Sequence, residues 1–434
     1  MLTGNLYKNI FIYSVPLVFT NILQLLFNIA DVAIVGKFAG SLSLGAVGST
    51  TLLVSLTTGW LIGIANGVNA LVAFYLGAGE ENHEQEACGT GFLLCLFMGI
   101  LTLLAGLVAS KSVLTLLGTK TELIEEATLY FRIYMLGSPA LAIFNYGNSV
   151  LSARGNTRKP LLYLTISGIV NIILNLLFVL SLNMTSDGVA YASVISQYLS
   201  AAMILISLCS RKRNIRPIKL CCFDAGMAIK ILKIGVPAAL QYSLFSIANL
   251  FVQSAVNTFD HVVVEGNSAA MNFDSIVYET MAAFYVATTS FIAQNYGAGQ
   301  KERIVKTYRI TTLYSFGIAV VMGIFINIFK VPLLYIFTND ADVVAAGSIR
   351  LSILSITYCL SAFMDNATAA CRGLGKTAVP TVIVLLGTIV FRVVWIYTVF
   401  AHFRTLESIY ILYGCAFVLT AIFQNIYFHK IEQL

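Results

Sequence analysis

Four polar side chains recur on one face of the first apolar stretch of the chain. They are spaced three, four and three residues apart, and they are Asn21, Gln24, Asn28 and Asp31. Residues three or four apart share one face of an α-helix. A carboxylate on such a polar face can bind a proton or a small cation. We therefore expect this face to line a cavity with a cation site near Asp31; a polar contact between packed helices is the alternative.

Two further stretches carry polar residues at a similar depth. Asn171 and Asn175 are four residues apart and share a helical face, and Ser193 lies near the start of the next stretch. At 1.5 Å per residue, Asp31 and Ser193 lie ~9 Å and Asn175 ~12 Å from the same end of their helices. We expect the four residues to form one ion-coupling site. Ordinary hydrogen bonds between helices would also account for the two asparagines.

A second polar stripe occurs in the second half of the chain. It is spaced four, three and four residues apart and consists of Tyr242, Ser246, Asn249 and Gln253. Asn249 matches Asn28 of the first stripe, but near the position that matches Asp31 this copy offers only the neutral Gln253. The cation site is therefore expected in the first half of the chain. The residues expected to line the substrate cavity are Asn21, Gln24, Asn28, Asn249 and Gln253.

The second half has acids of its own inside apolar stretches. Asp274 and Glu279 lie in one stretch and Asp365 in another. Acids within membrane spans are rare and mark ion pathways, so all three are further candidates for ion coupling. Asp274 is close enough to a helix end to be solvated instead. Arg392 also lies inside a stretch, where it either neutralises one of these acids or extends toward the membrane surface.

Membrane-spanning helices must position these residues. The chain is 58% hydrophobic and 11% charged, whereas a soluble domain carries roughly 25% charged residues. A bilayer core needs about 20 apolar residues per helix. We predict an all-α integral membrane protein with twelve spans at 9–36, 44–76, 88–110, 122–152, 160–183, 188–209, 228–258, 264–296, 306–330, 343–371, 378–402 and 407–429. A charge that faced lipid would cost at least ~2.5–3.5 kcal/mol, so the Asp31 face must meet protein or water.

Several short sequence segments of the first half of the chain recur in the second half. The matching segments keep their order and nearly the same offset, and they are Val15-Pro16 with Val236-Pro237, Gly77-Ala78-Gly79 with Gly297-Ala298-Gly299, Arg132 with Arg350, and Arg154-Gly155 with Arg372-Gly373. Their common order indicates an internal repeat. We predict two pseudo-symmetric six-helix bundles, an N-terminal lobe over 1–210 and a C-terminal lobe over 228–434, joined by a basic connector over 211–227. Arg132 and Arg350 lie near helix ends, where we expect both to snorkel.

The basic residues predict the orientation. With the N-terminus inside, eighteen Lys and Arg residues fall on the inner face, and the outer face has only Lys37, Lys111, Lys120, Lys330 and Arg404. Inner loops of membrane proteins are enriched in Lys and Arg. We expect both termini in the cytoplasm. The net charge of +6 lies in short loops and does not indicate a nucleic-acid partner.

Several segments, taken together and in order, carry a family resemblance. They are Val15-Pro16 before Asn28-Ile29-Ala30-Asp31, Ala153-Arg154-Gly155-Asn156-Thr157, Asn171-Ile172-Ile173-Leu174-Asn175, Tyr296-Gly297-Ala298-Gly299 and Arg372-Gly373-Leu374-Gly375-Lys376-Thr377. Over its whole length the chain resembles the multidrug and toxic compound extrusion (MATE) family of secondary transporters. The resemblance implies two bundles around a central cavity that opens alternately to the two sides of the membrane.

The resemblance also implies an activity and its site. It implies export of organic, often cationic, amphipathic compounds in exchange for protons or sodium ions. The family's first-helix acid falls on Asp31, and the tenth-helix acid of one branch falls on Asp365. Asn175 stands where many members have Asp, which makes this site less anionic. We expect a monomer in the cell membrane with no cofactor and no resident metal; sodium, if it is the coupling ion, would bind near Asp31 or Asp365.

Other classes of membrane protein fit the sequence less well. A lipid-linked oligosaccharide flippase of the same superfamily is the first alternative, but the charges within the spans are mostly acidic and favour a cationic cargo. A membrane-embedded enzyme would need a catalytic motif, and neither His-Glu-x-x-His nor Gly-x-Ser-x-Gly occurs in the sequence. A channel would need a selectivity filter, and no segment resembles one. An exporter remains the prediction.

Overall fold

The computed structural model describes residues 1–210, 218 and 222–432. Within these residues the chain forms helices and no strand. Eleven of the described helices are long and apolar enough to cross a membrane, and one bent pair makes a twelfth span. The predicted all-α architecture with twelve spans is confirmed. Most of the predicted connector, residues 211–217 and 219–221, lies outside the described residues.

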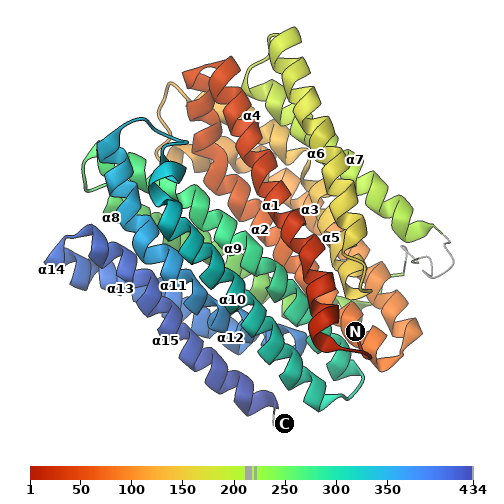
Figure 1. The fold of residues 1–434 in the computed structure, drawn as a ribbon. Coiled ribbons are helices and arrows are strands. Elements are labelled where there is room, and N and C mark those ends of the chain that lie inside the picture. Colours follow the sequence, from red (N-terminus) through yellow and green to blue (C-terminus); the bar gives the residue numbers. More distant parts are fainter. Residues whose placement is uncertain (211–217, 219–221, 433–434) are drawn as a thin grey trace. The chain divides into compact units, whose positions relative to one another are not determined.

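The spans follow one another along the colours of Figure 1. The first six are α1 (Leu6–Ile34) with the π-helical turn η1 (Val35–Ala39), α2 (Ser41–Ala78), α3 (Glu81–Leu116), α4 (Ile124–Met135) with α5 (Ser138–Ala153), α6 (Arg158–Leu176) with the π-helical turn η2 (Leu177–Ser181), and α7 (Ser186–Cys209). The second six begin with α8 (Ala225–Val256), α9 (His261–Gly297), α10 (Lys301–Leu334) and α11 (Ala341–Gly373). The eleventh span is a run of short pieces, namely α12 (Ala378–Val384), η3 (Leu385–Val390), α13 (Phe391–Trp395), η4 (Ile396–Phe400) and α14 (Ala401–Phe403), and α15 (Leu406–Glu432) is the last.

The fourth span is bent rather than straight. α4 and α5 meet at an angle of 45°. Pro139 lies in the first turn of α5. Proline is tolerated there because the N–H that it lacks would have no partner within the helix, but it cannot continue the preceding helix. Gly137 sits at the bend, and a Cβ there would overlap the side chain of Gln197. A larger residue at this position would have to displace the Gln197 side chain, and the span predicted over 122–152 is bent here rather than straight.

By contact the chain divides into two compact units. Unit 1 contains Met1–Asn21 and Leu244–Leu434, and unit 2 contains Ile22–Ser243. The chain therefore passes from one unit to the other within α1 and again within α8. The predicted lobes, 1–210 and 228–434, describe the repeat in the sequence rather than contact, and their boundaries stay a prediction.

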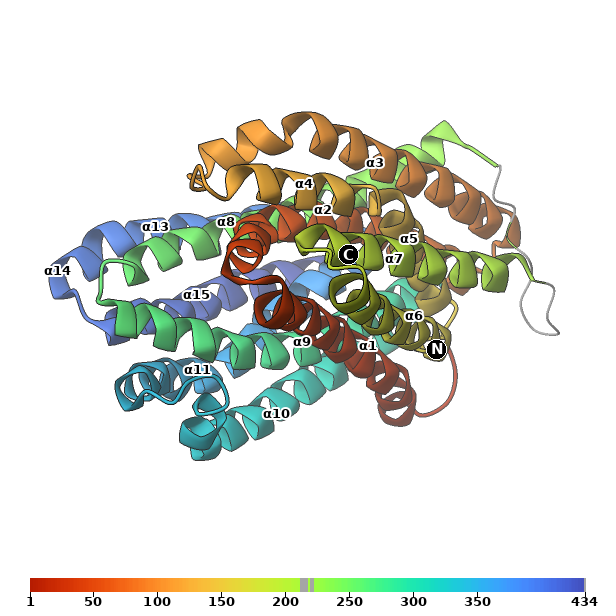
Figure 2. The same cartoon turned by 90° about the horizontal axis from the view of Figure 1, so that it is seen from above.

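In unit 2, a glycine stripe on α2 packs against the first part of α8. Gly59, Gly63 and Gly67 are four residues apart and share one face. A Cβ on Gly67 would lie 2.6 Å from the carbonyl oxygen of Ile231 and 2.8 Å from the backbone nitrogen of Gly235. Small residues at this spacing let the backbones of membrane helices approach closely. On another side of unit 2, α6 and α7 lie side by side (Figure 2).

In unit 1, the first part of α1 packs on α9. Ile10 and Leu17 share a buried apolar cluster with Ala283 and Ala287 of α9. Tyr13 of α1 donates a hydrogen bond from its hydroxyl to Ser290 Oγ over 2.9 Å. α9, α10 and α11 pack on one another, and α15 packs on α11 (Figure 1). An apolar cluster and one buried hydrogen bond thus attach the first part of α1 to unit 1.

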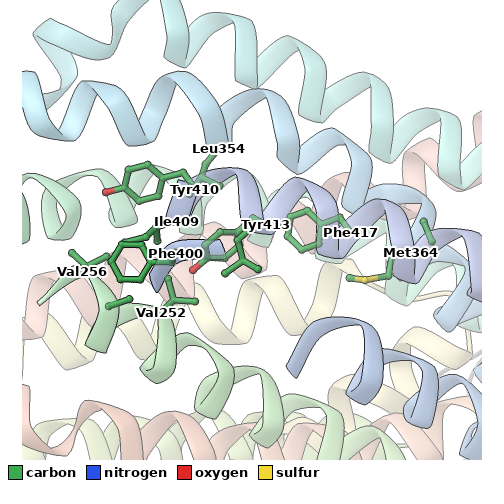
Figure 3. Close-up of a cluster of buried hydrophobic side chains, with 12 residues drawn as sticks. Val252, Val256, Leu354, Met364, Phe400, Ile409, Tyr410, Tyr413 and Phe417 are labelled. Carbon is green, nitrogen blue, oxygen red and sulfur yellow. The ribbon is translucent and has the colours of Figure 1, made fainter. Parts of the chain in front are cut away.

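A second apolar cluster in unit 1 joins α8, η4 and α15. Figure 3 shows its members Val252, Phe400, Tyr410 and Tyr413. Val252 is 2% exposed and Tyr410 is fully buried. The partly buried side chains packed against the cluster include Phe245. This cluster forms the apolar wall beside the charged residues described below.

Candidate functional site

The structure brings the four residues of the predicted first-half site together in unit 2. We call Asp31, Asn171, Asn175 and Ser193 the Asp31 cluster. Asn175 donates from Nδ2 to Asp31 Oδ1 over 2.6 Å. Ser193 donates from its hydroxyl to Asp31 Oδ2 over 3.1 Å. Each carboxylate oxygen of Asp31 is therefore held by a different helix, α6 through Asn175 and α7 through Ser193.

Asn171 connects the two donors to each other. Its Nδ2 donates to Ser193 Oγ over 3.3 Å, and its Oδ1 accepts from Asn175 Nδ2 over 3.2 Å. Asn175 is fully buried, and Asn171 and Ser193 are 6% exposed. Asn175 and Asn171 lie one helical turn apart on α6, which is the spacing that the sequence showed. The cluster is thus a closed ring of hydrogen bonds around one carboxylate.

One oxygen of this ring has no partner. Asn175 Oδ1 is buried and accepts no hydrogen bond. Buried polar atoms are usually paired, and an unpaired one calls for an explanation such as a missing ion or water. The Asp31 cluster offers oxygen atoms from a carboxylate, two amides and a hydroxyl, which suit a proton or a hard cation. Among the described residues, no group of three or more His, Cys, Asp and Glu side chains could hold a metal ion.

Two π-helical turns flank the cluster. η1 begins four residues after Asp31, and η2 begins two residues after Asn175. Such turns are often found at functional sites because they interrupt the regular pattern of helical hydrogen bonds. An apolar cluster that includes Val35, Val179 and Val189 packs beside these turns. Electrostatic interactions, including hydrogen bonds, are stronger in such apolar surroundings than in water.

The polar stripe of α1 does not act as one unit. Asn21 belongs to unit 1, where its Nδ2 donates to the backbone carbonyl of Glu279 over 3.0 Å. Gln24 and Asn28 belong to unit 2, the first half-buried and the second exposed. In unit 1, Gln253 accepts a hydrogen bond from Asn267 over 3.1 Å. A role of these residues in lining a substrate cavity stays a prediction.

In unit 1, Asp274 is paired rather than solvated. It is 4% exposed, and Arg350 Nε donates to its Oδ2 over 2.7 Å. Arg350 Nη1 also donates to Asn267 Oδ1 over 2.6 Å. The expectation that Arg350 snorkels is wrong, because an acid lies within reach inside the protein. Arg132, its counterpart in the repeat, is exposed and contacts Ser110.

The other two candidate acids of unit 1, Glu279 and Asp365, make no ion pair among the described residues. Glu279 is half-buried. Asp365 is 6% exposed, and its Oδ2 has no hydrogen-bond partner. The hydroxyl of Tyr285 lies beside Asp365. Asp365 therefore keeps an open acceptor, whereas Asp274 is fully engaged.

Arg392 neither neutralises an acid nor reaches the surface. It is 1% exposed and forms no ion pair within the described chain. Its Nη1 donates to Asn249 Oδ1 over 2.8 Å, and its guanidinium carbon lies 4.4 Å from the ring centre of Tyr413. Both alternatives expected for Arg392 are therefore wrong. Asn249, Arg392 and Tyr413 lie far apart in the sequence, and nothing in their spacing indicates that they meet.

Two residues of this region were missed by the sequence reasoning. Asn267 links Gln253 to Arg350, and Tyr410 donates to Asn267 Oδ1 over 3.2 Å. Asn267 precedes Asp274 by seven residues on α9, two helical turns on the same face. That spacing was a usable signal.

The family model of MatE matches residues 16–177 and again residues 237–398. The chain belongs to the MatE family. The two matches are equally long, and the offset between them is the one that separates Pro16 from Pro237. The resemblance inferred from the sequence is confirmed, and so is the prediction that this MatE protein is a transporter and not an enzyme.

Relatives of this MatE chain match most of its length. The probable multidrug resistance protein YoeA of Bacillus subtilis is 24% identical, covering 96% of this chain and 92% of the relative. The FAD transporter of Shewanella oneidensis is 24% identical over 76% of this chain and 74% of that protein. A crystal structure of MATE in complex with MaL6 superimposes with a TM-score of 0.93 at 24% identity, covering 100% and 97% of the two chains. The names of these relatives do not favour the flippase alternative.

Proposed function

We propose that this MatE chain is a secondary active antiporter of the cell membrane. It exports organic, cationic amphipathic compounds in exchange for protons or sodium ions by alternating access, with both termini in the cytoplasm. Membership of a multidrug efflux family supports export of small molecules. The observation that carries the coupling step is the Asp31 carboxylate, held by Asn175 and Ser193 inside unit 2.

Asn175 suits two charge states of Asp31. With Asp31 ionised, the Asn175 amide donates to the carboxylate. With Asp31 protonated, a rotated amide offers its oxygen to the carboxyl proton, because Asn carries both donors and an acceptor. The same rotation turns a second oxygen toward a bound sodium ion. Either ion neutralises Asp31, and the rotation replaces the bond that Asn175 Nδ2 donates to Asn171 Oδ1 by a bond that the Asn175 oxygen makes at Asp31.

Coupling requires that the ion changes the affinity for the exported compound. An ionised Asp31 in a region of low dielectric attracts a cationic compound. A proton or a sodium ion that enters from the outside removes this attraction and favours release. Asp31 thereby links the two binding events, although nothing else in unit 2 needs to change its charge.

The proposal is tested by efflux of a fluorescent organic cation from proteoliposomes. A proton gradient and a sodium gradient are imposed separately on the wild type and on Asp31→Asn. We expect gradient-driven efflux in the wild type and its loss in Asp31→Asn, because the amide cannot change charge. Glu302→Gln removes an exposed acid and is the matched control.

Two outcomes would contradict the proposal. Gradient-driven efflux that survives in folded Asp31→Asn would move the coupling to Glu279 or Asp365. Absence of transport under either gradient would reject an ion-coupled exporter of cations, and lipid-linked sugars would be the next cargo.

A further inference from the structure

Arg392 is a buried cation without a counter-ion. It lies in α13, between the π-helical turns η3 and η4. Its Nε is buried and has no hydrogen-bond partner. Asp274 of the same unit is paired with Arg350, so that this pair is neutral in itself. The buried polar groups of this part of unit 1 therefore carry one positive charge that no described carboxylate balances.

An isolated buried charge is costly unless it is paired. The ring of Tyr413, 4.4 Å from the guanidinium carbon, and the ring of Phe245, 6.0 Å away, offset a part of this cost through cation–π interaction. Asn249 adds one hydrogen bond. An Arg guanidinium has five N–H donors, and its fork matches the two oxygens of a carboxylate or phosphate. The site therefore has unused capacity for an oxyanion.

The repeat places this cation in the counterpart of a span that holds the Asp31 cluster. The two family matches begin and end at the same offset, which pairs Asn249 with Asn28, and Arg392 lies in the eleventh span, the repeat counterpart of the fifth span with Asn171 and Asn175. Asp31 itself corresponds to Val252, which is buried in an apolar cluster with Tyr413 (Figure 3). The same region of the repeat thus holds an anion in unit 2 and a cation in unit 1.

Asn249 connects Arg392 to the surface of unit 1. Asn249 is exposed, whereas Arg392 beneath it is not. A polar side chain within a span faces protein or water rather than lipid. The Oδ1 of Asn249 is engaged by Arg392, which leaves its amide N–H groups to donate outward. An oxyanion that approaches Asn249 therefore meets amide donors first and a guanidinium behind them.

We propose that Arg392 and Asn249 form an oxyanion-binding site for a carboxylate or phosphate group of the transported compound. This proposal deepens the proposed function, because it rests on export of small amphipathic compounds. Its consequence is that acid-bearing compounds, including zwitterions, are preferred over cations that lack the acid.

Two dyes that differ in one group test this preference. Rhodamine B carries a carboxylate, and its ethyl ester is the same dye with that acid blocked. Efflux of each dye is measured from proteoliposomes, and binding is measured by quenching of Trp395 in a Trp60→Phe background. Trp395 is three residues from Arg392, and the chain has only two tryptophans. In the wild type, we expect the acid to bind more tightly than the ester.

Two variants remove the site in different ways. Arg392→Gln removes the charge, and we expect the ratio of acid to ester binding to fall roughly 10–100-fold, the loss of one charge-assisted contact. Asn249→Asp keeps the guanidinium but supplies a carboxylate in place of the amide oxygen. We expect this variant to melt no lower than the wild type and to lose the same preference. Arg392→Lys should recover a part of it, and Arg404→Gln, which removes an exposed charge, is the control.

The outcomes separate this proposal from the proposed function. An unchanged acid-to-ester ratio in folded Asn249→Asp or Arg392→Gln would overturn the oxyanion site, even if gradient-driven efflux persists. A wild type that binds both dyes equally would also overturn it. An Arg392-dependent preference in binding without gradient-driven efflux would sustain the site and reject the antiporter.

Discussion

At the scale of single residues, the ionisable groups within the spans differ in whether a residue of opposite charge compensates them. Asp274 is matched by Arg350, Asp31 is held by neutral donors, and Arg392 has no counter-ion. We expect a matched pair to have a structural role, because each charge is already neutralised by its partner; ion coupling at Asp274 stays a prediction. The groups that lack a partner of opposite charge are the ones from which transport is expected.

The Asp274–Arg350 pair is expected to matter for stability. Asp274→Asn leaves a buried guanidinium unbalanced, which costs about 3–5 kcal/mol. The double variant Asp274→Leu with Arg350→Met removes both charges and should recover most of that loss. Melting temperatures of the purified protein in detergent measure both effects, and Glu302→Gln serves as the control. Equal melting of Asp274→Asn and the control would show that the pair contributes nothing.

Side-chain spacing predicted the grouping of the Asp31 cluster but not the pairing of Arg350 with Asp274. Asp31, Asn171, Asn175 and Ser193 could be grouped because each is polar in an apolar helix and lies at a common depth. Their role in ion coupling stays a prediction. Arg350 could not be assigned, because a guanidinium near a helix end can turn outward or inward. The direction depends on Asp274, 76 residues away, and a single sequence does not show such a contact.

At the scale of helices, the stripe of Gly59, Gly63 and Gly67 fixes the first part of α8 in unit 2. A Cβ on Gly63 would overlap the backbone of Ala239. Three glycines four residues apart are a known packing pattern of membrane helices, but this signal was not used in the prediction. The bend of the fourth span and the π-helical turns could not be predicted, because both depend on tertiary packing.

Replacing Gly63 by alanine should therefore change the stability in the direction opposite to the same replacement at Gly48, another glycine of α2. Gly63→Ala forces α2 and α8 apart and should lower stability by about 1–3 kcal/mol, as overpacking does. Gly48→Ala meets nothing within 4 Å and should stabilise the helix by roughly 0.5–1 kcal/mol. Thermal unfolding followed by circular dichroism compares them. A Gly63→Ala protein as stable as Gly48→Ala would mean that the helices are not in close contact.

At the scale of the whole molecule, the repeat and the contacts divide the chain differently. The repeat was predicted from matching segments such as Val15-Pro16 and Val236-Pro237, and the two family matches agree with it. The division by contact, which cuts α1 after Asn21 and α8 after Ser243, was not predicted. It depends on the packing of Ile10 and Leu17 against α9 and of the α2 glycines against α8, rather than on the order of the spans.

The orientation of the chain is expected to have both termini in the cytoplasm. Arg404 follows α14 and is exposed, and Arg158 opens α6 and is exposed. In intact cells, a membrane-impermeant maleimide should label Arg404→Cys and should label Arg158→Cys only after the cells are opened. A background without the native cysteines removes other labelling. The reverse pattern would place the termini outside and invert the direction assigned to transport.

The passage of α1 from one unit to the other has a consequence for the time course of synthesis. Unit 2 can be completed when the ribosome has added Ser243, because it consists of Ile22–Ser243. Unit 1 cannot, because Ile10, Tyr13 and Leu17 pack on α9, which is made later. The start of the nascent chain therefore waits in the membrane with its apolar side uncovered until the second half emerges. During that interval the newly inserted protein depends on lipid or on the insertion machinery to cover the segment that is made first.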